Sequence, residues 1–221
     1  LFWGILLIVI IRGTGRMHQD KWLKKVLVLG LLVRVPMVLI HLAVGYWIYG
    51  GSLDFPAYFT HGVLIGQDLL VGSWDRFLDF LTVPVNKRGT KFVARLIALD
   101  YFLTGPSLVG FFFISGILGF LGSYFFIRAY ENVFPSRSGN RFLILSLFFL
   151  PSLAFWTSLL GKESWIFFLF GLTTYSVARL LREAHLGYLL VLLISLLLII
   201  LLRPLVGIVI VLSLAACAFI R

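Results

Sequence analysis

Long apolar segments separated by short basic loops are the feature that most constrains how this chain can fold. A helix needs about 20 apolar residues to cross a bilayer. The segments lack the alternating pattern of barrel strands, and only a helix satisfies its own backbone groups in lipid, so we expect helices. The sequence therefore predicts an all-α polytopic membrane protein with about six to seven transmembrane helices. The clear segments are 26–49, 108–127, 142–160, 164–180, 187–202 and 205–220, and residues 1–11 look like the end of another.

The composition favours a membrane protein over a soluble one. The chain is 61% hydrophobic and only 13% charged, whereas charged residues make up about 25% of a soluble domain. Its net charge of +10 does not indicate a nucleic-acid partner, because the chain has no basic, aromatic-interleaved soluble segment. Lys and Arg instead collect in cytoplasmic loops and beside anionic lipids, so membrane lipids are the expected partners.

The chain is expected to form a single transmembrane domain over residues 1–221, without an internal repeat or a low-complexity linker. It begins at Leu1 without an initiator methionine, so we expect a fragment or an incompletely known N-terminus. The first apolar run does not read as a signal peptide, because the basic residues follow it. Cys217 is the only cysteine, which excludes a disulfide within the chain.

The distribution of charge predicts how the segments are oriented. Residues 91–104 are short and carry three charges, and a charge at the bilayer centre costs about 3 kcal/mol. If they do not cross, the basic loops at 12–25, 128–141 and 179–186 all lie on one side, as the positive-inside rule requires. We therefore expect residues 50–107 to form one long loop on the outer side of the membrane.

That outer loop is expected to contain two helices lying at the membrane interface. Residues 57–72 place polar side chains at heptad spacing on one side and apolar side chains on the other. The second helix is expected at 91–104. The stretches 74–76 and 85–90 have the composition of polar loops.

Six polar residues are expected to meet at the outer face. Asp54 follows the first long segment directly, in a turn-rich and aromatic stretch, and the tight turns after 142–160 and 187–202 lie on the same side. Arg can hold a phosphate through a bidentate fork and Lys as a point charge, while a carboxylate can act as general base on a hydroxyl. The arrangement therefore suits a reaction on a lipid phosphate. The candidates are Asp54 as the catalytic residue, with Tyr58, His61, Lys162, Glu163 and Arg203 as substrate-binding residues.

Each candidate also has a structural interpretation. Asp54 can cap the helix that follows it. The turn at 162–163 can simply be solvated, and Arg203 can snorkel to the lipid headgroups. His61 can be a surface residue of an interfacial helix.

Two further polar residues lie within the segment 26–49. Arg34 and His41 are one heptad apart and share a face of the predicted helix. Ionisable residues inside a membrane favour a functional role, although Arg34 can also snorkel. The chain has no P-loop, GxSxG, HExxH or CxxC pattern, so no specific cofactor is predicted, and a divalent metal stays open.

Several short stretches, taken in order, resemble the GT-C superfamily of polytopic glycosyltransferases. The closer resemblance is to family 39-like and uncharacterised bacterial membrane proteins associated with polysaccharides. It covers most of the chain from about residue 30 onward, and 150–163 is the most specific stretch. The matching stretches are Asp54–Gly62, Gly89–Val93, Arg128–Tyr130, Leu150–Glu163 and Leu202–Pro204.

The resemblance implies a function that the residues alone do not name. It implies Asp54 as the catalytic base, a polyprenyl-phosphate sugar as the donor, and inverting transfer to an acceptor outside the bacterial inner membrane. It also implies a first outer loop with an acidic residue near its start and helices parallel to the membrane. Many GT-C enzymes pair two acidic residues at this point, whereas Phe55 follows Asp54 here.

Two other classes of function compete with this one. The first is a non-catalytic transmembrane subunit of a larger membrane complex, built on the same scaffold, with other membrane subunits as partners. The second is a transporter or lipid flippase. It is less well supported, because the mid-membrane polar residues are few and no paired broken helices recur.

Overall fold

The computed structural model describes residues 21–51, 53–79, 82, 85–134 and 140–220, and every regular element within them is a helix. This confirms the predicted all-α fold. The predicted end of a span at 1–11 lies outside the described residues. The elements are α2 (Lys21–Ala43), the π-helix η1 (Val44–Ile48), α3 (Phe55–Leu70), α4 (Asp75–Leu78), α5 (Val85–Thr104), α6 (Leu108–Val133), α7 (Arg141–Phe149), α8 (Pro151–Trp156), α9 (Lys162–Leu180), α10 (Leu186–Leu202) and α11 (Pro204–Ile220).

Two of these helical stretches are long and apolar enough to cross a membrane. They are Lys21–Ile48, which joins α2 to η1, and Leu108–Val133, which is α6. Helices α10 and α11 are also apolar but shorter. The expected six to seven crossings remain a prediction.

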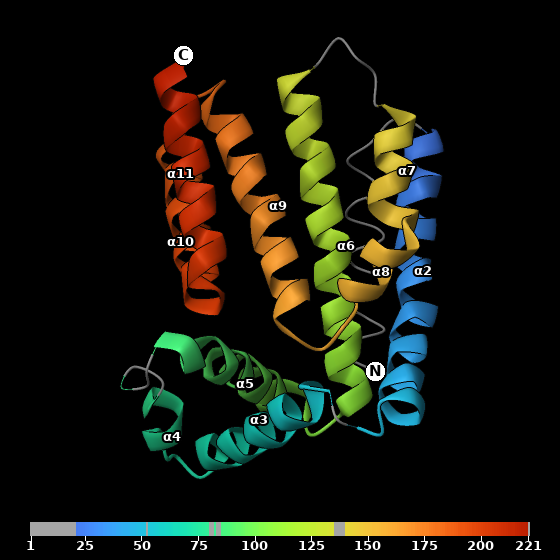
Figure 1. Cartoon of the computed structure of the whole chain (residues 1–221), viewed down its shortest axis with the longest axis vertical. Helices are drawn as coiled ribbons and strands as arrows, with labels where there is room; N and C mark the ends of the chain where they lie inside the picture. The colour runs from blue at the N-terminus through green and yellow to red at the C-terminus, as the bar shows by residue number, and fades with distance from the viewer. Residues whose placement is uncertain (1–20, 52, 80–81, 83–84, 135–139, 221) are drawn as a thin grey trace.

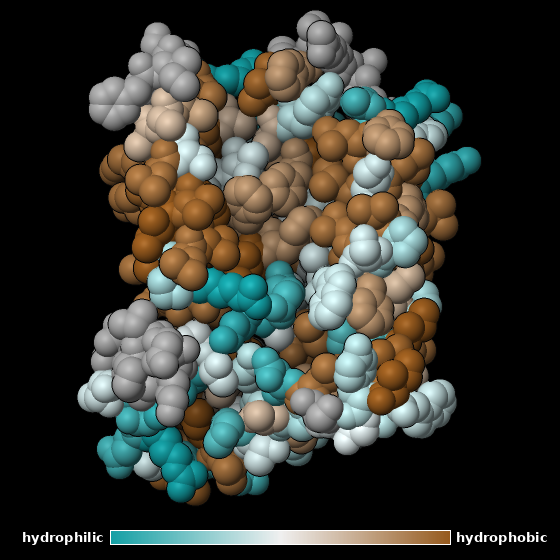
Figure 2. Space-filling model, in the orientation of Figure 1, coloured by the Kyte–Doolittle hydropathy of each residue, from teal (hydrophilic) through white to brown (hydrophobic). Residues whose placement is uncertain are grey.

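The helices form two groups that run in different directions (Figure 1). Helices α2, α6, α7, α9, α10 and α11 run roughly along one direction and form what we call the bundle. Helices α3, α4 and α5 lie across one end of it and form the crosswise layer. Helix α3 packs against α5, and α5 contacts α6, α9 and α10 of the bundle. Brown apolar side chains cover much of the visible bundle surface, and teal hydrophilic ones gather where it meets the crosswise layer (Figure 2).

Close packing within the bundle depends on glycines. A Cβ atom added to Gly171 of α9 would lie 2.5 Å from the carbonyl oxygen of Gly122 on α6. One added to Gly119 of α6 would lie 2.3 Å from the carbonyl oxygen of Thr157. Small residues at such crossings let two helix backbones approach each other, as in membrane helix pairs.

The crosswise layer agrees with the predicted helices but corrects the predicted loops. The helix expected at 57–72 is Phe55–Leu70. The loop predicted at 85–90 is wrong, because this stretch forms the first turns of α5. Gly89 is needed here for close approach, since its added Cβ would lie 2.2 Å from the carbonyl oxygen of Leu202. Residues Asp75–Leu78 likewise form a short helix in place of part of the loop predicted at 74–76.

The segment predicted at 142–160 is interrupted at Pro151 and contains two helices. Helix α7 ends at Phe149 and α8 begins at Pro151. Leu150 between them has an extended backbone, with φ −61° and ψ 115°. A residue that precedes proline is restricted to extended conformations, so Pro151 forces this break.

Arg34 is buried and joins three helices, α2, α6 and α8. Its Nη1 donates to the carbonyl oxygen of Ala154 at 3.0 Å and to the hydroxyls of Thr157 and Ser158. Its Nη2 lies 3.4 Å from the Ser123 hydroxyl on α6. The arginine therefore ties α2 to α6 and to the end of α8, and its guanidinium is bonded inside the protein.

Candidate functional site

Asp54 stands at the start of α3 without capping it through its side chain. Its backbone carbonyl accepts the first helical hydrogen bond, from the Tyr58 amide, but its carboxylate makes no capping bond. The Tyr58 hydroxyl, one turn along the helix, lies 3.4 Å from Asp54 Oδ2 and donates to it. The position predicted by the capping interpretation is therefore right, but the carboxylate does not cap the helix.

Asp54 opens onto a cavity of about 350 Å³ between α3, η1 and the end of α8. Tyr58 and Glu163 also line it, so two carboxylates and a phenol face one space. We call this space the carboxylate cavity. The aromatic part of its wall comes from Tyr49, Phe55, Phe155 and Trp156, together with His41.

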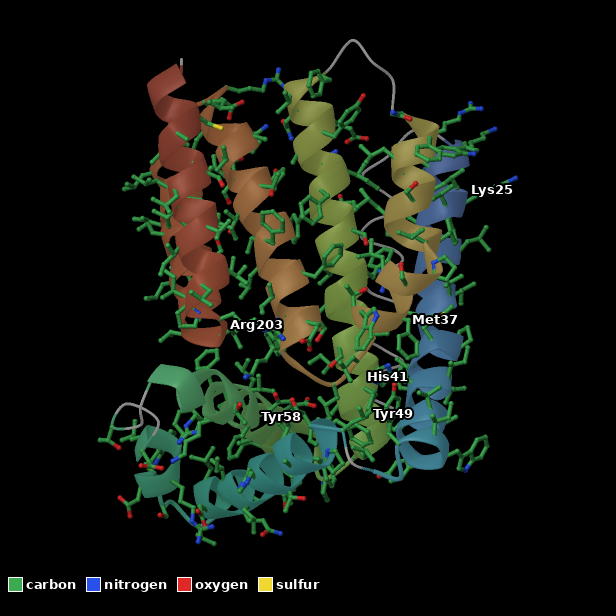
Figure 3. The ribbon with its side chains drawn as sticks, viewed as in Figure 1. Lys25, Met37, His41, Tyr49, Tyr58 and Arg203 are labelled. Atoms are coloured by element: carbon green, nitrogen blue, oxygen red, sulfur yellow. The ribbon has the colours of Figure 1, made fainter. Side chains whose placement is uncertain are left out.

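The two predicted cations lie beside the carboxylates. Lys162 is the first residue of α9, and its Nζ donates to the Thr90 hydroxyl of α5 at 3.0 Å. Arg203 immediately precedes α11, and its Nη2 forms an ion pair with Glu163 Oε1. Neither cation is part of the lining of the carboxylate cavity. Tyr58 and Arg203 both lie where the bundle meets the crosswise layer (Figure 3).

The electrostatics of the two cations follow from this placement. Burial lowers the pKa of Lys162, and the nearby Arg203 lowers it further, while Asp54 and Glu163 oppose the shift. Helices α9 and α11 both begin at this junction, so the positive ends of two helix dipoles add to the cationic side. The site thus has an anionic part at Asp54 and Glu163 and a cationic part at Lys162 and Arg203.

Tyr58 forms a wall between the carboxylate cavity and a second one. Burial raises the pKa of its phenol to about 12, and the carboxylates of Asp54 and Glu163 add to the rise, against an opposing effect of Thr90. The phenol is therefore protonated near neutral pH and acts as a hydrogen-bond donor.

The second cavity, of about 630 Å³, lies within the crosswise layer and takes in His61. We call it the crosswise cavity. Its cations are already bonded. Lys91 pairs with Asp79 at 2.6 Å and Arg76 with Asp68 at 3.3 Å, and Arg95 donates to three backbone carbonyl oxygens. The structure therefore brings Asp54, Tyr58 and Glu163 together, and His61 stands apart from them as an exposed residue of the neighbouring cavity.

The sequence interpretation did not include Thr90 and His41 in the site. Thr90 falls in the stretch 85–90 that reads as a loop. His41 shares a helix face with Arg34, yet their surroundings differ, because Arg34 is bonded inside the bundle while His41 lines the carboxylate cavity. The signal that could have identified His41 is its place about two turns before the end of the span Lys21–Ile48, close to Asp54 in the sequence.

The described residues contain no group of three or more His, Cys, Asp or Glu side chains arranged to hold a metal ion. No protein-family model, curated protein or solved structure matches the chain.

Proposed function

We propose that this chain is a GT-C-like membrane glycosyltransferase. It would move a sugar from a polyprenyl-phosphate donor to an acceptor at the outer face of the membrane, with Asp54 as the base. The proposal rests on one observation: two carboxylates line the cavity and two cations lie beside them. A base for the acceptor and a holder for a phosphate are the two functions that this transfer needs.

The arrangement of the helices supports a reaction at a membrane surface. In this proposal the bundle crosses the bilayer six to seven times, and the bilayer is the bacterial inner membrane. Helices α3 and α5 then lie parallel to the lipid surface, with the polar junction at headgroup level (Figure 2). A substrate anchored in lipid would bring its phosphate to the level of Lys162 and Arg203.

The chemical step follows from the positions of these groups. Asp54 takes the proton of an acceptor hydroxyl as its oxygen attacks the anomeric carbon of the donor sugar. The bond from that carbon to the phosphate oxygen breaks, and its electron pair leaves with the lipid phosphate. Lys162 and Arg203 stabilise the charge that develops on the leaving phosphate. Attack opposite the leaving group inverts the anomeric configuration.

The test is sugar transfer by the protein in lipid vesicles supplied with a panel of polyprenyl-phosphate sugars. Asp54→Asn keeps the shape of the side chain but removes the base, so transfer should fall by at least about a hundredfold. The matched control is Asp79→Asn, which changes an exposed carboxylate of the crosswise layer and should leave transfer unchanged. Full activity of the Asp54→Asn protein would exclude Asp54 as the base.

The second candidate is a non-catalytic subunit of a larger membrane complex. The pairing of both cations supports it, since Arg203 is bonded to Glu163 and Lys162 to Thr90. Such pairs can serve structure alone. This candidate predicts stoichiometric co-purification with other membrane subunits and no transfer by the isolated chain with any donor of the panel.

A further inference from the structure

We infer that the carboxylate cavity binds a neutral, hydroxyl-bearing ring such as a sugar, and that His41 is its hydrogen-bonding residue at the inner end. The inference deepens the proposed function and rests on it for the identity of the ring as the acceptor. It adds a binding residue from the first long helix to a site otherwise built at the helix ends.

His41 is a buried polar group that lacks a bond. The residue has only 2% relative exposure. Neither ring nitrogen has a hydrogen-bond partner among the described residues. Leaving a buried polar group unbonded costs about 1–3 kcal/mol. The ring lies against Phe155, with 4.4 Å between ring centroids, and it lines the cavity. Both ring nitrogens are closed off from the cavity as the ring is placed, so the imidazole has to turn toward the cavity for a ligand to bond it and recover this cost.

The imidazole selects among ligand classes. A neutral imidazole presents one donor and one acceptor nitrogen. A hydroxyl group both donates and accepts, so it can satisfy either nitrogen. A phosphate group offers acceptors, and Asp54 and Glu163 on the same wall repel it. A quaternary ammonium group offers neither a donor nor an acceptor.

The walls of the cavity agree with a sugar ring. Its volume of about 350 Å³ lies within the range of about 300–1,000 Å³ typical of small-molecule pockets. Trp156 and Tyr49 line it with side chains that are 54% and 52% exposed, so aromatic surface is open to a ring. The carboxylates of Asp54 and Glu163 can accept hydrogen bonds from ring hydroxyls. The cations lie outside this lining, which leaves the donor phosphate on their side of the site.

The test uses ¹⁵N-histidine NMR of the protein in nanodiscs. The chain has four histidines, and His41→Phe assigns the His41 signals by their loss. A panel of neutral hexoses is titrated in, with inorganic phosphate and tetramethylammonium as separate probes. We expect at least one hexose to shift the His41 signals saturably, and neither phosphate nor tetramethylammonium to do so.

Two variants measure the contribution of the cavity. His41→Phe and Trp156→Ala should each weaken binding of the same hexose by about tenfold, roughly the value of one or two hydrogen bonds or one stacking contact. The matched control is His61→Phe, in the crosswise cavity, which should bind the hexose like the unchanged protein. Circular dichroism of each variant checks that it is folded.

Each outcome decides the inference separately from the proposed function. No His41 shift with any hexose, or a saturable shift with phosphate or tetramethylammonium alone, overturns it. If sugar transfer depends on Asp54 but no hexose shifts the His41 signals, the glycosyltransferase proposal is retained and this binding site is excluded. If a hexose shifts the His41 signals but no sugar is transferred, the sugar-binding site is supported and the enzymatic function is excluded.

Discussion

The hydroxyl of Tyr58 lies 3.4 Å from Oδ2 of Asp54, one helical turn away on α3. This contact links the candidate base to the wall shared by the two cavities, because Tyr58 lines both of them. Asp54 itself is exposed, so the phenol is the described group that orients its carboxylate. The reactivity of Asp54 should therefore depend on Tyr58.

Tyr58→Phe should slow sugar transfer without abolishing it. The variant removes one hydrogen bond to the carboxylate but keeps the buried ring, and such a bond contributes about 1 kcal/mol, or roughly three- to tenfold in rate. Initial rates at saturating donor measure the effect. Tyr130→Phe is the matched control, because Tyr130 lies in the last turn of α6, at the end of that helix away from the site. This change should not alter the rate. Equal rates for the Tyr58→Phe and unchanged proteins would show that the contact does not orient the base.

The raised pKa of Tyr58 predicts a difference in alkaline stability. Burial first, and then the carboxylate of Asp54, raise this pKa from 10.0 to about 12. A raised pKa in the folded state adds stability that is fully present below pH 10 and is lost as the pH rises to about 12. The free energy of unfolding in detergent micelles should therefore fall more steeply between pH 10 and 12 for the unchanged protein than for Tyr58→Phe. Parallel curves would contradict the shift.

The apolar pattern and the prolines predict much of this fold. Helices α10 and α11 begin and end within a residue of their predicted bounds, because Arg203 and Pro204 interrupt an otherwise continuous apolar run. At Pro151 a proline in the middle of an apolar run does more than kink a helix, because it separates α7 from α8. Hydropathy alone does not distinguish a kinked span from two short helices.

Long-range packing explains what the sequence pattern did not predict. The polar stretch 85–90 reads as a loop, yet Gly89 packs onto the Leu202 carbonyl and the stretch is helical. Arg34 and His41 look equivalent on one helix face. Their roles differ because only Arg34 bonds the hydroxyls of Thr157 and Ser158. These two residues lie more than a hundred positions further along the chain, so a local pattern does not show the contact.

Arg34 should tolerate an apolar replacement better than a lysine. Its described acceptors are the Ala154 carbonyl and the hydroxyls of Thr157, Ser158 and Ser123. The Ser158 hydroxyl itself donates to the Ala154 carbonyl, so removal of the guanidinium leaves that acceptor bonded. Arg34→Met then removes a buried charge without leaving an unbonded donor, and should change the free energy of unfolding by less than about 1 kcal/mol.

Arg34→Lys keeps the buried charge but cannot reach several acceptors with a planar fork. We expect it to lose about 2–4 kcal/mol of unfolding free energy. Denaturant titration in detergent micelles compares the two variants, with Lys25→Met, an exposed residue of the same helix, as the control. A lysine variant more stable than the methionine variant would show that charge alone, and not the geometry of the fork, is what the site requires.

The contact between α6 and α9 should fail when Gly171 gains a side chain. The added Cβ of Gly171→Ala would lie 2.5 Å from the carbonyl oxygen of Gly122, and backbone cannot move aside as a side chain can. The two helices must separate, at a cost of about 1–3 kcal/mol in the free energy of unfolding. Gly187→Ala is the matched control, since its Cβ would meet only the His185 ring, at 3.0 Å. That control should be neutral or slightly stabilising, because alanine favours a helix over glycine by about 1 kcal/mol. Equal stabilities of the two variants would mean that α6 and α9 do not need this close approach.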